Sequence, residues 1–442
     1  MYWEALSLDD INKHVHLALS QNILYGDDPV MGYPASFLDR VVFPKKDILK
    51  SSVFWRTLWE NPNHIGCHTF GLSESVFEGT HKIERDLLRI CAEELFKAKP
   101  KTWDGYVASG GTEANIQALW VLRNYWANKH SESDTRKGSA KQKRRNAQEI
   151  HNKITIISSE DRHYSIDKAA GILNLHHEII SVNEQNRQMD FEHLSTVIDG
   201  EIEEGVEFFA VVLNMGSTMY GSVDNIDAVT ELFKSKSVEF RIHVDAAFGG
   251  FIYPLVNFEN KLNFLNPHII SFTLDAHKML QAPYGTGIYL SRKGYIEGVL
   301  TKGASYVKGQ DCTLSGSRSG ANAISVWMIL RAYGSQGGID FCHEIWERSN
   351  VLCDGLEELK VRYFRERYMN IVTISSAFIS ESLAQKYHLV PNCHENPQWW
   401  KIVVMDHVDS TVISSFLFDM SSEIGSSTAN VKIETGVKFW IN

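Results

Sequence analysis

The apolar run that ends at Ala108 leads into residues suited to hold an anion. It is followed by Ser109-Gly110-Gly111-Thr112-Glu113 and then by a helical pattern. Two glycines let backbone N–H groups approach an anion closely, and the start of a helix adds unpaired N–H groups and the positive end of its dipole. A phosphate group would fit this turn, although a tight strand-to-helix turn capped by Thr112 explains the same residues equally well.

Asp245 stands at the end of a second apolar run, 240–245, and small residues follow it. A carboxylate in such a place must be paired or hydrogen-bonded. It could cap a turn, or it could keep the nitrogen of a ring protonated, with Ala247 leaving room for a flat ring.

Lys278 comes shortly after a third apolar run, 269–274. A desolvated lysine has a lowered pKa and can form an imine with a carbonyl group. The alternative is a lysine whose ammonium group reaches the surface along its alkyl chain.

The three features together are more specific than any one of them. They occur in the order anion site, acid and lysine, and Lys278 comes 33 positions after Asp245. Pyridoxal 5′-phosphate (PLP) needs such a set: a site for its phosphate, a partner for its pyridine nitrogen and a lysine for a Schiff base. The spacing therefore predicts a PLP site.

With these motifs the sequence resembles the group II PLP-dependent amino-acid decarboxylases, which belong to the fold type I, aspartate-aminotransferase-like superfamily. The resemblance runs from about Gly32 to Gly338. Besides the anion-binding turn, it rests on these segments: Met31-Gly-Tyr-Pro34, Ser158-Ser-Glu-Asp-Arg-His163, Asn214 to Asp224, His243-Val-Asp-Ala-Ala247, Asp275-Ala-His-Lys278 and Leu314 to Gly320.

The resemblance implies a role for each matching residue. Lys278 would hold PLP covalently, Asp245 would pair with the ring nitrogen, and His163 would stack on the ring. The other cofactor-binding residues that it implies are Ser109, Gly110, Gly111, Thr112 and His277 at the phosphate, Thr218 and Ala247 near the ring, and Ser317 from across a homodimer interface. Several relatives have Asn where this chain has Asp275, so a phosphate role is not carried over to that position.

Tyr306 lies between the lysine motif and the 314–320 segment, in a stretch that has no clear helix or strand pattern. Such a stretch is typical of a mobile loop at an active site. Relatives carry on such a loop a tyrosine that returns a proton to Cα, which implies the same role for Tyr306. A loop tyrosine that only packs is the alternative.

The implied activity is decarboxylation of an L-amino acid to its amine and carbon dioxide. The N-terminal resemblance favours histidine or another aromatic amino acid, while other parts equally resemble tyrosine/aspartate decarboxylases. The alternatives are a PLP-dependent carbon–carbon lyase of the sphingosine-phosphate-lyase kind and a catalytically silent binding protein of the same fold.

The elements that must position these residues alternate between strand and helix patterns. Strands are expected at 103–108, 154–158, 208–214, 240–245 and 269–274, and helices at 113–128, 165–173 and 321–333. This alternation predicts an α/β domain with a largely parallel sheet, in which ligands lie at the carboxyl ends of the strands. The resemblance implies seven strands flanked by helices, and a small C-terminal α+β domain.

The same patterns divide the chain into three parts: an N-terminal arm (1–55), a large PLP-binding domain (56–320) and a small C-terminal domain (321–442). The segment 130–153 is rich in Lys, Arg, Ser, Gln and Asn. A solvated helix end or loop is expected there rather than a binding patch, because runs of like charge are usually solvated.

Composition limits the class of protein. The 442 residues include 44 Lys and Arg against 54 Asp and Glu, a net charge of −10, which disfavours nucleic-acid binding. The apolar runs are far shorter than the roughly 20 residues of a membrane-spanning helix. Six scattered cysteines without Cys-x-x-Cys spacing favour a reduced, cytoplasmic protein.

The segment His64-Ile-Gly-Cys67-His68 has the residue types of a metal site. No second ligand cluster with metal spacing accompanies it, so no metal is expected. Lining of a substrate pocket and a purely structural role both remain open for this segment, because relatives line that pocket with the residues that follow, 74–84.

Overall fold

The computed structural model describes residues 62–73, 77–131, 139–301 and 310–427, together with residues 29, 31, 32, 57 and 308. The predicted arm, 1–55, therefore lies almost entirely outside the described residues, and so does Tyr306.

A seven-stranded sheet forms the centre of the molecule. Its strands are β1 (Trp103–Ala108), β2 (Ile154–Ser159), β3 (His176–Ile180), β4 (Phe208–Asn214), β5 (Glu239–Asp245), β6 (Ile269–Asp275) and β7 (Gly287–Arg292). The strand order is β1-β7-β6-β5-β4-β2-β3. Strands β3, β2, β4, β5 and β6 run parallel, and β7 is antiparallel to both β6 and β1. The predicted α/β fold with a largely parallel sheet is confirmed.

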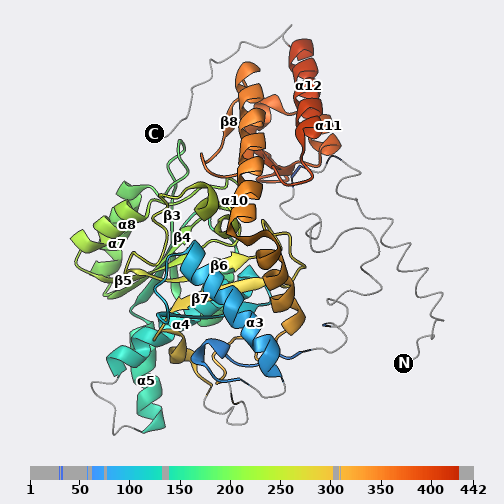
Figure 1. The fold of residues 1–442 in the computed structure, drawn as a ribbon. Helices are drawn as coiled ribbons and strands as arrows, with labels where there is room; N and C mark the ends of the chain where they lie inside the picture. Colours follow the sequence, from blue (N-terminus) through green and yellow to red (C-terminus); the bar gives the residue numbers. More distant parts are fainter. Residues whose placement is uncertain are drawn as a thin grey trace, which may run out of the picture.

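Helices cover both faces of this sheet (Figure 1). They are α3 (Glu78–Arg89), α4 (Gly111–Ser131), α5 (Ala140–His151), α6 (Ser165–Leu173), α7 (Phe191–Glu203), α8 (Ile226–Ser235) and the short α9 (Tyr253–Val256). Short helical turns lie at η2 (His68–Phe70), η4 (Ile90–Leu95), η5 (Gly249–Phe251), η6 (Ile296–Val299) and η7 (Ser376–Phe378).

Strand β4 shows why the central strands are continuous apolar runs. Phe209, Val211 and Leu213 point into the core that α7, α8 and α10 (Gly320–Glu358) share. Phe208, Ala210 and Val212 point into the core under α4 and α6. Because neighbouring residues of a strand face opposite sides, a sheet with helices on both faces needs apolar residues at every position.

A long helix connects the large sheet to a second, smaller region. Helix α10 (Gly320–Glu358) begins with Ser319 as its N-cap, and Gly334 interrupts it with φ 62° and ψ −176°. The smaller region holds a four-stranded sheet of order β10-β11-β9-β8 and two helices. Its elements are β8 (Tyr363–Phe364), β9 (Ile371–Ser375), β10 (Val390–Pro391), β11 (Trp399–Val403), α11 (Glu381–Lys386) and α12 (Ser410–Ser427).

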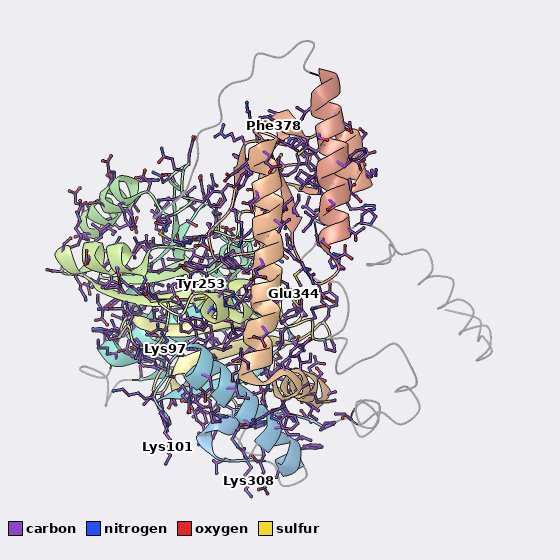
Figure 2. All side chains as sticks on the ribbon, turned by 45° about the horizontal axis from the view of Figure 1, so that its top comes forward. Lys97, Lys101, Tyr253, Lys308, Glu344 and Phe378 are labelled. Atoms are coloured by element: carbon purple, nitrogen blue, oxygen red, sulfur yellow. The ribbon has the colours of Figure 1, made fainter. Side chains whose placement is uncertain are left out.

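Figure 2 shows how far α10 extends. Phe378 of the smaller region and Lys308 lie at opposite ends of the molecule, and Glu344 on α10 lies between them. The helix therefore spans from the large sheet to the smaller region. None of the described helices is long and apolar enough to cross a membrane.

Candidate functional site

The polar residues predicted from the strand ends meet at one edge of the sheet. Asp245 is the last residue of β5, Lys278 follows β6 by three residues, and His163 follows β2 by four. These strands are parallel, so their carboxyl ends share one edge, where ligands of such sheets bind.

The charges at this edge act on one another. Burial lowers the pKa of His163, the charge of Asp245 opposes this shift, and Lys278 adds to it. His163, Asp245 and Lys278 lie far apart in the sequence, but the fold brings them to the same edge of the sheet, within electrostatic range of one another.

The carboxylate of Asp245 is held at both oxygens. Its Oδ2 accepts a hydrogen bond from Asn115 Nδ2 at 2.8 Å, and its Oδ1 accepts one from the Ala247 N–H at 3.1 Å. Asp245 is only 6% exposed. The sequence predicts that this acid is hydrogen-bonded, but nothing in it singles out Asn115, which looks like any polar residue of a helix.

His163 is tied to the same network through Ser165. His163 Nδ1 lies 2.8 Å from Ser165 Oγ, and Asn115 Nδ2 donates to that hydroxyl oxygen at 2.8 Å. Ser165 is the first residue of α6 and is fully buried. The predicted ring-stacking residue and the predicted acid thus share one hydrogen-bonded network.

Lys278 lies beside a second buried acid. Its Nζ is 3.7 Å from Asp275 Oδ2, and His277 Nδ1 is 3.5 Å from Asp275 Oδ1. Burial raises the pKa of Asp275, although Lys278 and His277 oppose the shift. The carboxylate of Asp275 also packs closely against Gly111 at the start of α4.

The predicted anion-binding turn forms the start of α4. A Cβ at Gly111 would lie 2.7 Å from Asp275 Oδ2, so a side chain there would displace this carboxylate, whereas a Cβ at Gly110 would meet nothing within 4 Å. Ser109 donates its backbone N–H to Glu113 Oε2 at 3.0 Å. The open space beside Gly110 lies at the N-terminus of a 21-residue helix, a place that favours an anion.

The remaining predicted residues lie on two loops. Thr218 is exposed, and its carbonyl oxygen accepts a hydrogen bond from Lys401 Nζ at 3.1 Å. Ser317 is also exposed, and its hydroxyl accepts one from Asn63 Nδ2 at 3.1 Å.

Lys401 is a buried lysine that was not among the site residues predicted from the sequence. It belongs to β11 of the smaller region, and burial together with the charge of Lys278 lowers its pKa to about 8. It is only 6% exposed. A single lysine within the apolar run of β11 was its only signal in the sequence.

These residues fit PLP on chemical grounds. The amine of Lys278 suits a carbonyl carbon, and the buried carboxylate of Asp245 suits a protonated ring nitrogen. His277 Nδ1 is a buried atom without a hydrogen-bond partner, and the open space beside Gly110 would accept a phosphate.

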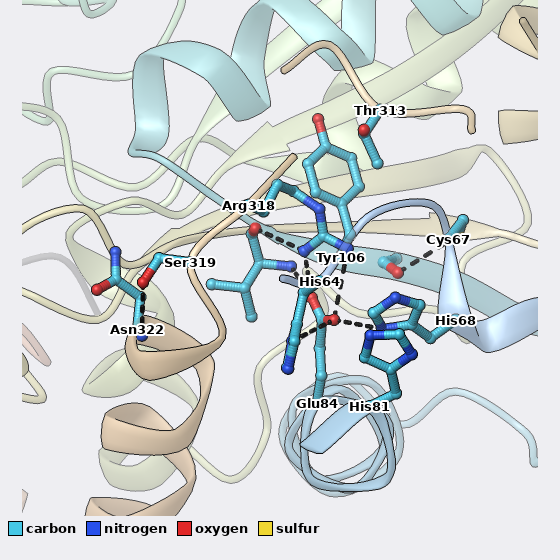
Figure 3. A network of polar contacts seen from close by, with 12 residues as sticks. His64, Cys67, His68, His81, Glu84, Tyr106, Thr313, Arg318, Ser319 and Asn322 are labelled. Carbon is cyan, nitrogen blue, oxygen red and sulfur yellow. Dashed lines mark hydrogen bonds and ion pairs between the residues drawn. The ribbon is translucent and has the colours of Figure 1, made fainter. Parts of the chain in front are cut away.

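A buried cluster next to this edge surrounds Glu84 (Figure 3). Arg318 donates to Glu84 Oε1 and, through its second terminal nitrogen, to the Gly66 carbonyl at 2.7 Å. His64 Nδ1 and His68 Nδ1 lie 3.0 and 2.7 Å from Glu84 Oε2. Burial opposes the shift, but Arg318 and the two histidines hold the pKa of Glu84 well below its usual value.

The contacts of this cluster favour a structural role for His64 and His68. Both separations from Glu84 Oε2, 3.0 and 2.7 Å, are shorter than the spacing of neighbouring ligand atoms around a tetrahedral zinc ion. The guanidinium of Arg318 on the same carboxylate also disfavours a cation. The cluster instead joins α3 to the segment that leads into α10.

Comparison with known proteins connects this site to a family. A profile described as the pyridoxal-dependent decarboxylase conserved domain matches residues 82–373. A tryptophan decarboxylase of Clostridium sporogenes is 41% identical over 95% of this chain and 97% of its own length.

Two solved structures share the fold. L-methionine decarboxylase of Streptomyces sp. 590 has a TM-score of 0.73 at 19% identity, with 94% of this chain and 95% of that chain covered. A sphingosine-1-phosphate lyase of Burkholderia pseudomallei has a TM-score of 0.74 at 16% identity, with 96% and 92% covered.

Proposed function

The chain belongs to the pyridoxal-dependent decarboxylase family, and we propose that its substrate is L-tryptophan or a closely related aromatic L-amino acid. As a PLP-dependent amino-acid decarboxylase, it releases carbon dioxide and the corresponding amine. The observation that supports the aromatic substrate is the 41% identity with a tryptophan decarboxylase over 95% of this chain.

Three residues would act on the cofactor ring. When bound, PLP supplies an electron sink for the pair released as the Cα–carboxylate bond breaks. Lys278 would hold the cofactor covalently, Asp245 would keep the ring nitrogen protonated, and His163 would pack on the ring. Because Asp245 is buried and already oriented by two donors, its charge would act at the ring nitrogen with little screening.

The phosphate would lie at the start of α4. Ser109, Gly110, Gly111, Thr112 and His277 would surround it, with Ser317 from a second subunit. Thr218 and Ala247 would lie near the ring. Asp275 packs closely against Gly111, whereas the space beside Gly110 is open, so the open side of the turn at Gly110 is the better place for the anion.

Two further residues would act on the substrate. Lys401 adds a second amino group within electrostatic range of Lys278, and its positive charge would attract the substrate carboxylate. Tyr306, outside the described residues, remains our proposed donor of the proton to Cα.

The substrate proposal is tested by offering the purified enzyme, saturated with PLP, each of the twenty amino acids. We expect the highest kcat/KM for tryptophan, with carbon dioxide and tryptamine formed in equal amounts. Aspartate or histidine as the best substrate would contradict the aromatic assignment.

The same assay separates a second activity. The lyase alternative is worth testing because the chain shares its fold with a sphingosine-1-phosphate lyase. A carbon–carbon lyase would release an aldehyde and no carbon dioxide from its substrate, so measuring both products distinguishes the two.

We also propose that the protein acts as a homodimer in the cytoplasm. The dimer would bring the 314–320 segment of one subunit to the cofactor of the other. All six cysteines are free thiols, five of them buried, which suits a reducing compartment. Cell fractionation with an antibody to the chain would test the compartment.

A further inference from the structure

Both the nitrogen and the oxygen of the Asn115 side-chain amide have hydrogen-bond partners inside the protein. Its Nδ2 donates one hydrogen bond to Asp245 Oδ2 and one to Ser165 Oγ, both at 2.8 Å. Its Oδ1 lies 2.9 Å from His243 Nε2. An amide has two N–H donors, so no donor of Asn115 is left over, and the residue is only 1% exposed.

The neighbours of Asn115 allow only one orientation of this amide. With the oxygen and nitrogen exchanged, the amide oxygen would face the carboxylate of Asp245, and two acceptors would meet in a buried place. The N–H groups therefore point to Asp245 and Ser165.

His243 also favours this orientation of the Asn115 amide, through a contact with its oxygen. Burial lowers the pKa of His243 to about 4, so its ring is neutral near pH 7 and carries a single N–H. Its Nδ1 lies 2.8 Å from Ser271 Oγ. The Nε2–H then donates to Asn115 Oδ1, and the serine hydroxyl donates to Nδ1.

Ser165 connects the Asn115 amide to His163. Because Ser165 Oγ accepts a proton from Asn115, its own hydroxyl hydrogen is available for His163 Nδ1. The Ser165 N–H also points to that atom, at 3.3 Å. His163 Nδ1 is thus an acceptor, and the neutral ring carries its proton on Nε2.

We propose that Asn115 is a positioning residue for two groups of the cofactor site. It fixes the carboxylate of Asp245 directly, and it fixes the tautomer of His163 through Ser165. The inference rests on the proposed roles of Asp245 and His163 toward PLP. It adds that one buried amide couples the acid at the ring nitrogen to the histidine at the ring.

Asn115→Leu tests the inference with a side chain of similar size and no polar atoms. Gln117→Leu is the matched control, because Gln117 is a fully buried amide on the same helix that bonds Tyr106 and the Cys312 carbonyl instead. Three quantities are measured for each PLP-saturated enzyme: kcat and KM, the dissociation constant of PLP, and the pH midpoint of the visible absorption band of the lysine-bound cofactor.

We expect Asn115→Leu to lower kcat roughly ten- to a hundredfold, the effect of one hydrogen bond to a charged group, with a smaller change in KM. PLP should bind more weakly and the band midpoint should shift. Gln117→Leu should leave the band midpoint and the PLP dissociation constant at wild-type values. An Asn115→Leu enzyme with the wild-type midpoint and PLP affinity would overturn the anchoring of Asp245.

Ser165→Ala separates the two branches, because it removes the link to His163 and leaves the amide on Asp245. We expect a lower kcat with an unchanged band midpoint; an unchanged kcat would overturn the branch to His163. If Asn115→Leu does not accumulate as folded protein, Asn115→Ser is measured for the same outcomes. The band and the PLP affinity need no substrate, so a wrong substrate assignment would leave this test intact.

Discussion

At the scale of single residues, Asp245 is expected to act through its charge rather than its shape. Asn in place of Asp245 keeps the size and can still accept from the Ala247 N–H, but it cannot pair with a protonated ring nitrogen. Asp245→Asn should therefore retain the fold and lower kcat by orders of magnitude. Single-turnover kinetics with PLP-saturated enzyme measure this, and a loss below about tenfold, or about 1.4 kcal/mol, would show that the pairing contributes little.

The two neighbouring lysines should differ in what they do. Lys278→Ala should abolish turnover and the borohydride-reducible link to PLP. Lys401→Met is the matched control: the link should persist while KM rises, because only the second positive charge is lost. Peptide mapping after borohydride reduction checks both variants, and a pyridoxyl group on any lysine other than Lys278 would refute the assignment.

The buried histidines give stability a pH dependence whose sign can be worked out. Burial lowers the pKa of His81 from 6.5 to about 4, in a site that it shares with His64, His68 and Glu84. Between these pH values the unfolded chain is protonated at His81 and the folded chain is not, so stability falls as the pH drops from 6.5 toward 4.

Replacing His81 by Phe keeps an aromatic ring against His68, whose ring centroid lies 3.5 Å away, and removes the titrating group. The free energy of unfolding of His81→Phe should fall less steeply than that of the wild type over this pH range. Urea unfolding at a series of pH values measures both slopes, and parallel curves would count against a neutral, buried His81.

At the scale of elements, the Glu84–Arg318 pair joins α3 to the start of α10 and to β1, because Arg318 also donates to the Val107 carbonyl at 2.9 Å. Glu84→Leu leaves a buried guanidinium without its counter-charge and should cost about 3–5 kcal/mol. The double variant Glu84→Leu with Arg318→Met should lose much less than the sum of the single losses. Urea unfolding of all four proteins gives the coupling, and additivity within about 0.5 kcal/mol would show that the pair is not coupled.

The elements also show what the sequence could predict. Strands β4 and β6 were predictable because they are apolar runs of strand length with polar residues at their ends. Strand β3 was not, because it is an edge strand of sequence HHEII in which only the last residue is buried. The helix expected at 321–333 ends where Gly334 departs from helical geometry, but a second helical stretch continues α10 to Glu358.

The residues of the candidate site also fall into those that the sequence could predict and those that it could not. Asp245 and Lys278 were found because a polar residue just after a buried strand needs an explanation. Asn115, Ser165 and Lys401 were not, because what distinguishes them is a partner distant in the sequence. The hydrogen bond between Asn115 and Asp245 joins residues 130 positions apart in the sequence, and the one between Lys401 and Thr218 joins residues 183 positions apart.

At the scale of the whole molecule, the proposed dimer predicts an active site built from two chains. Lys278 and Ser317 would then serve one site from different subunits. Lys278→Ala removes the covalent attachment, and Ser317→Glu places a negative charge next to the proposed phosphate site, so each homodimer should be inactive. A mixed dimer, however, contains one site with native Lys278 from one subunit and native Ser317 from the other.

Refolding the two inactive variants together in equal amounts should therefore restore about a quarter of the wild-type activity, because half of the dimers are mixed and one of their two sites is complete. Sedimentation of the mixture confirms the dimer, and refolding each variant alone is the control. If both residues served the site of their own chain, neither site of a mixed dimer would be complete, and mixing would restore nothing. A fully active monomer at micromolar concentration would likewise contradict a shared site.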